Sequence, residues 1–461
     1  MKALKDPDRL LRNGLRDIRA QYQVPEAFPP ATLAAAQEAC QRVPNEHVDR
    51  TARPFVTLDP ASSTDLDQAF AIERAGADWL LHYAIADVAW FVRDGDALDT
   101  EAWERGTTTY LPDGKASLYP PALSECCASL LPDVERPAVI LTARIDPHGD
   151  SRLDGVERAV IRSRAKLAYE TVRSGDLPEG FAEIAARVAR AEDRRGAARV
   201  DPPEQQLEPN GEGGFSLGFR PYLPAETRNA ALSLAANLAV AGAMLEARTG
   251  LFRVMSPPDA EAEKRLRATA RAFHLDWPAA MPLTQFERRL DPSAPAQAAF
   301  MMAVRRAGNG ASYQPYDPQE LPWHAAIAAP YAHATAPLRR LADRYVLRAV
   351  LALARGQEVE PEVTHAIPRL PRVMGRAASR DSQIERAVID LAETSMLAHL
   401  EGCQFTATIT DVRGEQARLQ LADMPVIAST RAPGALPGQV LSVRLVRADP
   451  AQRVLEFEPA E

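Results

Sequence analysis

The chain has 461 residues, of which 46% are apolar, and this is enough material for one large core with one or two small satellite domains. The composition therefore excludes a disordered protein. A formal net charge of −8 gives no general attraction to nucleic acid, but Arg is abundant and clustered while Lys is scarce. An Arg-rich lining for phosphate groups is therefore not excluded.

Residues 1–50 have a mainly helical pattern. The apolar residues of segment 8–22 recur at helical intervals, and Pro29-Pro30 opens a second helix that runs through Cys40. We expect a small helical module, which is either of helix-turn-helix type or a helical prelude to the core. Four arginines share one flank of the first helix and suit either a recognition helix or a solvated face: Arg9, Arg12, Arg16 and Arg19.

Three short acids follow an apolar run that ends at Leu58. Asp59, Asp65 and Asp67 lie within nine residues, and carboxylates this close need a counter-charge to stay ionised together. Hard oxygen ligands of this kind suit Mg²⁺ or Mn²⁺, and such clusters serve phosphoryl chemistry. A solvated acidic turn is the alternative, because Asp and Ser favour loops.

Residues 51–395 mix strand and helix patterns as in an α+β domain. Strands are predicted at 79–84, 138–145 and 155–161 in the early half. Helices are predicted at 226–248, 259–273 and 338–355 in the later half. The segment 201–214 is rich in Pro and Gly, which predicts an exposed loop between the halves.

Residues 401–461 carry five short strand patterns separated by turn residues. The strands are predicted at 405–412, 416–421, 426–430, 439–447 and 453–457. Five strands in so short a block predict an OB-type barrel, a fold that often binds single-stranded nucleic acid. Its few aromatics, Phe405 and Phe457, suit either a core or a stacking platform.

The cysteines predict a reduced chain. There are four of them: Cys40, Cys126, Cys127 and Cys403. They show no metal-ligand spacing, and the neighbours Cys126 and Cys127 are poorly placed to pair with each other. We therefore expect a cytoplasmic protein.

No targeting or membrane segment is visible in the sequence. The N-terminus lacks the apolar region of a signal peptide. The longest apolar stretch, residues 230–245, falls short of a membrane span and carries Ser233 and Asn237. We read it as a buried helix and expect no membrane partner.

Two motifs stand at the acidic segment, Asp59-Pro-Ala-Ser-Ser-Thr-Asp-Leu-Asp-Gln-Ala and His82-Tyr-Ala-Ile-Ala-Asp-Val. They resemble the opening of the catalytic domain in the ribonuclease II and R family of exoribonucleases. Further segments resemble family elements in the family's order: Tyr110-Leu-Pro, Tyr119-Pro-Pro-Ala-Leu-Ser-Glu, Ser129-Leu-Leu-Pro, Ser163 to Tyr169, Phe252-Arg253 and Tyr331 to Asp343. Several motifs in register are far more specific than one acidic cluster.

The resemblance implies a catalytic set. In the family the aspartate cluster holds Mg²⁺, or Mn²⁺, at the scissile phosphate, and the matching positions are Asp59, Asp65 and Asp67. Arg339 matches an arginine that family members place on the reacting phosphate, where it offsets developing charge. By spacing alone Arg339 would equally suit an ion pair with Asp343.

The resemblance also implies RNA contacts. Tyr110 matches a tyrosine that clamps the 3′-terminal nucleotide, and Tyr169 matches a second aromatic in the same channel. Stacking of this kind suits every base. Arg340 is either a further RNA contact or the structural partner of Asp343. The histidines of the motif segments are expected to be core or hydrogen-bonding residues: His82, His324 and His333.

The chain departs from the family pattern in four places. Gln68 stands where most patterns have a fourth acid, and its amide oxygen can still ligate a hard cation with less charge. Ala230-Ala231 replaces a Glu-Glu pair, so a ribose contact must come from Glu226 or Asn229, or be absent. Thr335-Ala336-Pro337 lacks the customary middle Ser. The first 50 residues leave no room for paired cold-shock barrels.

The sequence therefore predicts an α+β protein with three parts: a helical module at 1–50, an RNB-type catalytic domain at 51–395 and an OB-fold barrel at 401–461. The resemblance implies a metal-dependent, processive 3′–5′ exoribonuclease that acts on single-stranded RNA as a monomer. A catalytically silent RNA-binding protein is the alternative, suggested by Gln68 and the two alanines. A helix-turn-helix regulator with an inherited nuclease body is a third reading.

Overall fold

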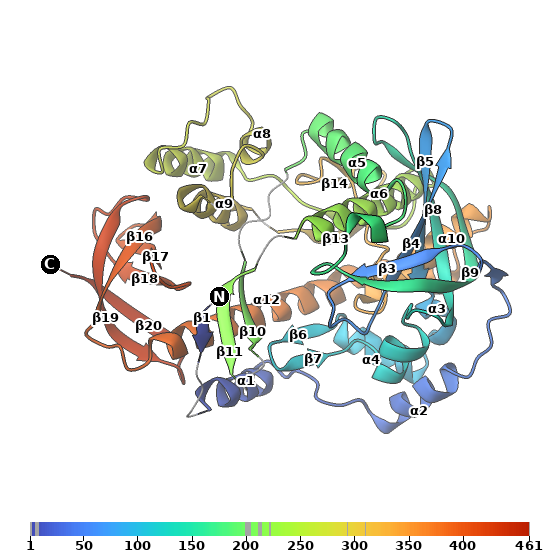
Figure 1. Cartoon of the computed structure of the whole chain (residues 1–461), viewed down its shortest axis with the longest axis horizontal. Coiled ribbons are helices and arrows are strands. Elements are labelled where there is room, and N and C mark those ends of the chain that lie inside the picture. The colour runs from blue at the N-terminus through green and yellow to red at the C-terminus, as the bar shows by residue number, and fades with distance from the viewer. Residues whose placement is uncertain are drawn as a thin grey trace.

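The computed structural model describes residues 2–4, 9–198, 204–210, 214–220, 223–292, 294–308 and 310–460 (Figure 1). Its centre is a six-stranded sheet of order β2-β9-β3-β4-β5-β8. The strands are β2 Val48–Asp49, β3 Phe55–Asp59, β4 Gln68–Ala75, β5 Asp78–Ala86, β8 Glu135–Ile145 and β9 Ser151–Ala168. Strand β8 also pairs with β9, so five of these strands form a continuous ring of pairings. The strands predicted at 79–84, 138–145 and 155–161 are confirmed.

Helices cover this sheet and share its core. Helix α6 (Pro224–Glu246) begins with proline at its first turn, which suits the unpaired amides there, and packs on β8 and β9. Among the described helices it alone is long and apolar enough to cross a membrane, and 56% of its most apolar window is buried inside the fold. Helices α5 (Phe181–Arg195) and α10 (Leu341–Ala354) pack against it. The apolar stretch is thus a core helix, as expected.

Shorter elements complete the central body. They are α3 Val88–Phe91, α4 Ala97–Arg105, β6 Thr109–Leu111, β7 Gly114–Ala116, the π-helical turn η1 Leu123–Cys127, η2 Ser174–Asp176, β12 Leu251–Val254, β13 Ser312–Pro315, β14 Trp323–His324, β15 Ala329–Pro330 and α11 Pro361–Ala366. Helix α10 begins three residues later than predicted. Residues 338–340 instead form a turn that pairs with the segment before β6.

The N-terminal helices pack on other parts of the molecule. Helix α1 (Leu10–Gln21) lies on α12 (Leu370–Leu397), and α2 (Pro30–Ala39) lies against α4 and η1. A Cβ atom at Gly14 would come within 2.5 Å of the Leu391 side chain, so α1 can approach α12 this closely only with glycine there.

One predicted loop contains a strand. Strand β10 (Gln205–Pro209) pairs with β11 (Phe215–Phe219), which also pairs with β1 (Lys2–Leu4). The prediction of a loop across 201–214 is therefore wrong for 205–209, while 201–203 and 211–213 lie outside the described residues. Burial of Leu207 and the pairing of β10 with β11, which is itself held by the distant β1, override the Pro and Gly content of the segment.

Two cysteines are joined, against expectation. A disulfide connects Cys40, directly after α2, to Cys127 in η1, 87 residues away. Cys126 and Cys403 are free and exposed. The spacing of the cysteines excludes only a bond between the neighbours Cys126 and Cys127. The prediction of a reduced chain is wrong because the fold brings Cys40 and Cys127 together over 87 positions.

Two satellites flank the core (Figure 1). Helices α7 (Ala260–Ala272), α8 (Leu283–Glu287) and α9 (Pro295–Ala307) share a small core around Trp277, Phe286 and Phe300. The C-terminal strands form a closed barrel of order β16-β17-β18-β20-β19, which confirms the OB-type prediction. They are β16 Gln404–Arg413, β17 Gln416–Leu421, β18 Ile427–Arg431, β19 Val440–Asp449 and β20 Val454–Pro459. Phe457 is 6% exposed, so it belongs to the barrel core.

Candidate active site

The acidic segment is the connection between β3 and β4, and side chains from distant elements fix it. Lys166 of β9 donates from Nζ to the carbonyl oxygens of Ala61 and Ser63, at 2.8 and 2.6 Å. The Ser129 hydroxyl donates to the carbonyl of Thr64 at 2.7 Å and accepts from the backbone amide of Leu66 at 2.9 Å. The loop that carries the acids is therefore ordered by three side-chain hydrogen bonds to its carbonyl oxygens and one from an amide.

Asp67 and Arg339 meet although they lie far apart in sequence. Asp67 is 5% exposed, its Oδ1 accepts from the Leu338 amide at 2.7 Å, and its Oδ2 lies 3.4 Å from Arg339 Nε. Asp59 feels the same guanidinium and also Asp65. The predicted acids and the predicted arginine thus share one electrostatic site.

The carboxyl groups of Asp59 and Asp67 are buried, and nearby positive charge does not offset the cost of burying their charged forms. Burial raises the pKa of Asp59 to about 6, against a lowering effect of Arg339. Burial likewise raises the pKa of Asp67 to about 7, again opposed by Arg339. The Oδ2 atom of Asp59 is buried and has no hydrogen-bond partner among the described residues. The site therefore favours an added positive charge.

The arginine turn is built around Asp343. This carboxylate is fully buried, accepts from the Ala336 amide at 2.8 Å and pairs with Arg340 at 2.7 Å. The backbone carbonyl of Arg339 accepts from Thr108 at 3.0 Å. Arg340 is thus held as the partner of Asp343, while the side chain of Arg339 stays 45% exposed.

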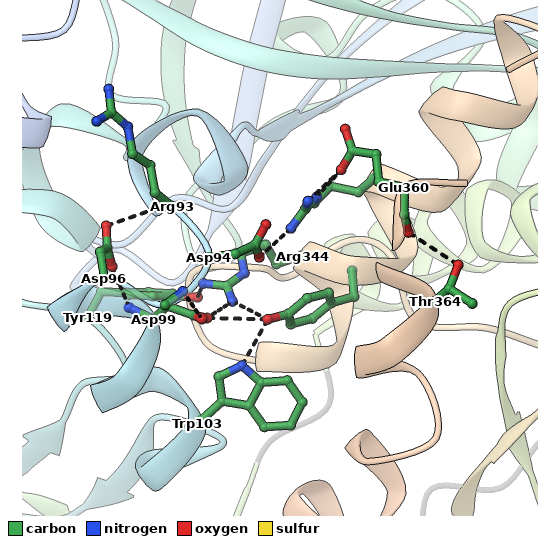
Figure 2. Close-up of polar contacts among 12 residues, drawn as sticks. Arg93, Asp94, Asp96, Asp99, Trp103, Tyr119, Arg344, Glu360 and Thr364 are labelled. Atoms are coloured by element: carbon green, nitrogen blue, oxygen red, sulfur yellow. Dashed lines mark hydrogen bonds and ion pairs between the residues drawn. The ribbon is translucent and has the colours of Figure 1, made fainter. Parts of the chain in front are cut away.

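A second buried network anchors the helix that follows (Figure 2). Arg344, 1% exposed, forms an ion pair with Asp99 of α4 and donates to the Tyr345 hydroxyl at 2.7 Å. Trp103 donates to the same hydroxyl at 2.8 Å, and Tyr119 lies 3.4 Å from the guanidinium. These contacts fix α10 against α4, and with it the turn that presents Arg339.

Asp65 takes a different partner, one that the sequence did not reveal. Its Oδ1 lies 2.9 Å from Nζ of Lys115, which also lies 3.1 Å from Glu125. Tyr110, 56% exposed, places its hydroxyl 3.4 Å from Oδ2 of Asp65. The scarcity of Lys in this chain was the only signal that could have drawn attention to Lys115.

The remaining predicted residues gather beside Asp59. The Tyr169 hydroxyl accepts from the Asn229 amide at 2.9 Å, and the same amide donates to the Leu58 carbonyl at 3.2 Å. Glu226 instead forms an ion pair with Arg220. Both candidates for a ribose contact therefore lie near Tyr169: Asn229 donates to its hydroxyl, and Glu226 acts on it electrostatically.

The position of the replaced acid is also occupied by a polar contact. The side-chain oxygen of Gln68 accepts a hydrogen bond from the buried Tyr83 hydroxyl. The motif histidines are hydrogen-bonded or buried, as expected: His82 contacts Thr142 and Glu73, His324 is 8% exposed, and His333 contacts Tyr313.

The acids fit a divalent cation chemically but do not form a ready cluster. Within the described ranges, no group of three His, Cys, Asp or Glu side chains could hold a metal ion as it stands. Asp65 pairs with Lys115, and Asp67 is bound by Leu338 and Arg339. The unpartnered oxygen of Asp59 and the raised pKa of Asp67 are the features that a hard cation would relieve.

Family comparisons agree with this architecture. The family model of the RNB domain matches residues 47–356, and that of the RNase II-type exonuclease C-terminal S1 domain matches residues 403–460. The chain is 26% identical to Ribonuclease R of Aquifex aeolicus over 428 residues, which cover 86% of this chain and 59% of that protein. It is also 26% identical to Ribonuclease R of Escherichia coli over 443 residues, which cover 87% and 54%. The chain thus spans somewhat more than half the length of these relatives.

Solved structures show the same fold. RNase R of Mycoplasma genitalium, in complex with ribose methylated single-stranded RNA, matches with a TM-score of 0.86 at 18% identity and covers 99% of this chain and 79% of its own. Yeast Ssd1, described as a pseudonuclease, matches with a TM-score of 0.69 at 16% identity and covers 96% and 58%. One fold thus carries both a ribonuclease and a pseudonuclease, so activity must be argued from the site.

Proposed function

Because the chain belongs to the RNB-domain family, we propose that it is a processive 3′–5′ exoribonuclease that hydrolyses single-stranded RNA to nucleoside 5′-monophosphates. The single observation that carries the proposal is the meeting of Asp59, Asp67 and Arg339 at one buried, undercompensated site. A cytoplasmic location and a monomeric state stay predictions.

The protein groups have distinct tasks in this proposal. Arg339 is anchored through its backbone and Nε but keeps a half-exposed guanidinium, which suits a contact to the non-bridging oxygens of the reacting phosphate. Tyr110 offers an exposed ring at the same place for stacking on the terminal base. Tyr169 and Asn229 close the opposite side beside Asp59.

Asp59, Asp65 and Asp67 are the residues that would hold a divalent cation, Mg²⁺ or Mn²⁺. When bound, such a cation supplies polarisation of the phosphate and activation of water. Lys115 lies on Oδ1 of Asp65, so Oδ2, which faces the Tyr110 hydroxyl, is the oxygen that Asp65 would offer to the cation, and Gln68 adds no charge. The raised pKa values of Asp59 and Asp67 support cation binding, because a nearby positive charge lowers both.

A path for the RNA strand is supported by a cavity of about 830 Å³ between α9, α12 and the barrel. Five arginines line it: Arg305, Arg306, Arg386, Arg418 and Arg453. The Nε and Nη2 atoms of Arg306 are buried without hydrogen-bond partners among the described residues. Three carboxylates of α12 also line the cavity and temper its charge: Glu385, Asp390 and Glu393. Arg305 pairs with Glu204, which also lines the cavity, whereas the guanidinium of Arg306 keeps donors that suit a phosphate of a passing strand.

A catalytically silent RNA-binding protein is the second candidate. It is favoured by Gln68, whose oxygen is already engaged by Tyr83, and by the lack of a ready metal cluster within the described ranges.

One assay separates the two candidates. The full chain is incubated with 5′-labelled RNA and Mg²⁺ or Mn²⁺, and we expect stepwise shortening from the 3′ end. Asp67→Asn should bind the same RNA and leave it intact, while labelled DNA of equal sequence tests sugar selectivity. Wild-type protein that binds RNA but shortens it with neither cation would overturn the nuclease proposal.

A further inference from the structure

The hairpin of β6 and β7 lies between the N-terminal helices and the acidic loop. Its strands pair Tyr110 directly with Lys115, so both side chains project from the same position along the hairpin. Asp113 lies in the turn that joins the strands. One short hairpin thus carries an exposed ring and two opposite charges next to Asp65.

Lys115 closes a polar ring around the acidic loop. Its Nζ atom lies 2.9 Å from Asp65 and 3.1 Å from Glu125, and Glu125 accepts from the Thr64 hydroxyl at 3.0 Å. Thr64 precedes Asp65 in the chain. The side chains of Lys115 and Asp65 are 22% and 11% exposed, so water screens this pair only in part.

The positive charge of Lys115 offsets the repulsion between Asp65 and the other two acids. Asp65 disfavours the charged forms of Asp59 and Asp67, so the three carboxylates repel one another. Arg339 pairs with Asp67 and also favours the charged form of Asp59. Without Lys115, nothing of positive charge among the described contacts of Asp65 would keep its carboxylate in the site.

The N-terminal module holds the hairpin at its tip. Arg19, in the last turn of α1, donates to both oxygens of Asp113, at 2.8 and 3.2 Å. Its side chain is 16% exposed. The base of the hairpin is fixed separately, because Thr107 and Thr109 donate to Asp381 of α12 at 2.9 and 2.7 Å.

The same module also reaches the element that supplies Glu125. The disulfide between Cys40 and Cys127 joins the end of α2 to η1, which carries Glu125. Both members of the pair beside Asp65 therefore stand on elements tied to the first 40 residues.

We propose that Lys115 is a positioning residue that holds Asp65 in the site, and that the N-terminal module sets its position through the contact between Arg19 and Asp113. The proposal rests on the proposed function for its effect on catalysis. It assigns the N-terminal helices a role inside the site, distinct from RNA recognition.

The test uses charge reversal in the full chain. Arg19→Asp and Asp113→Arg should each lower kcat about tenfold with little change in RNA affinity, and the double variant should restore kcat. Arg16→Asp is the matched control, because Arg16 is on the same helix, is 73% exposed and, within the described ranges, forms an ion pair with its neighbour Asp17 alone. Lys115→Met should lower kcat about 10- to 100-fold, and Lys115→Arg should recover part of it.

A second readout does not depend on catalysis. Amide hydrogen exchange of residues 60–67 should speed up about tenfold in Arg19→Asp and in Lys115→Met. It should return to the wild-type rate in the double variant that combines Arg19→Asp with Asp113→Arg. If the wild-type chain does not cleave RNA, the proposed function fails and hydrogen exchange alone decides the inference. Unchanged exchange in both single variants, or a double variant no better than the singles, would overturn it.

Discussion

Arg339 and Arg344 lie five positions apart, yet their surroundings are opposite. Arg344 is 1% exposed and finds Asp99, Tyr119 and Tyr345 around its guanidinium. The side chain of Arg339 is 45% exposed and pairs with Asp67 through Nε, at 3.4 Å. The guanidinium of Arg344 is therefore engaged by the fold, whereas that of Arg339 stays available for a ligand.

The carboxylates differ in the same sense. Asp99 is matched by Arg344 and by hydrogen bonds, whereas Asp59 keeps a buried oxygen without a partner and a raised pKa. A buried ion pair whose two charges are matched has a structural role, because removal of one partner leaves the other as an unpaired buried charge. A buried carboxylate that lacks a full set of partners indicates a binding site for a positively charged ligand.

The largest expected effect is on stability at the complete pair. Arg344→Met should lower the free energy of unfolding by about 3–5 kcal/mol, because Asp99 would be left as a buried unpaired charge. Urea denaturation of the full chain measures this. The double variant Arg344→Met with Asp99→Leu should recover much of the loss, and a single variant as stable as wild type would break the comparison.

Next comes an effect on rate at the incomplete pair. Arg339→Gln should lower kcat by about 10²–10³-fold, the cost of removing one transition-state donor. The unfolding free energy should change by less than about 1 kcal/mol, since the side chain is half exposed. Arg339→Lys should fall between, because it keeps the charge and loses the fork. A variant that loses stability and activity together would make Arg339 structural as well.

A smaller effect has the opposite sign. The folded pKa of Asp59, about 6, lies above the ordinary 3.8, so the stability that its protonated form contributes is lost as pH rises through about 6. At pH 8 in EDTA, Asp59→Asn should therefore raise the unfolding free energy by about 1–2 kcal/mol. Added Mg²⁺ should raise the melting temperature of wild type and leave that of the variant nearly unchanged. An asparagine variant that is less stable in EDTA at pH 8 would contradict this account.

The smallest effect belongs to the helical satellite. Burial raises the pKa of Glu287 from 4.5 to about 7, so stability falls as pH rises between those values. Glu287→Gln should stabilise the chain by about 1 kcal/mol at pH 8.5 and by nothing at pH 4. Thermal melts at the two pH values measure the difference, with exposed Glu261→Gln as the control. Equal gains at both pH values would exclude ionisation as the cause.

The parts that were predictable from sequence have local patterns or a family motif behind them. The barrel strands alternate and end at turn residues, and Arg339 was named through its motif. The pairing of β1 with β11 was missed because it spans about two hundred positions, from Lys2 to Leu217, whereas the local pairing of β10 with β11 was hidden by the Pro and Gly content of the segment. Lys115 was missed because it belongs to no periodic pattern or quoted motif, and Glu125 was missed because its motif, residues 119–125, carried no ligand role. Their role comes only from the hairpin that folds back on Asp65.

Helix α12 fixes the distance between two parts of the molecule. Asp381, near its middle, binds the base of the hairpin, and Glu393, near its end, accepts from the Ile427 amide of the barrel at 2.7 Å. The twelve helical steps from Asp381 to Glu393 rise by about 18 Å in an unbroken helix. One helix therefore joins the hairpin beside Asp65 to the barrel and holds the two at a fixed separation.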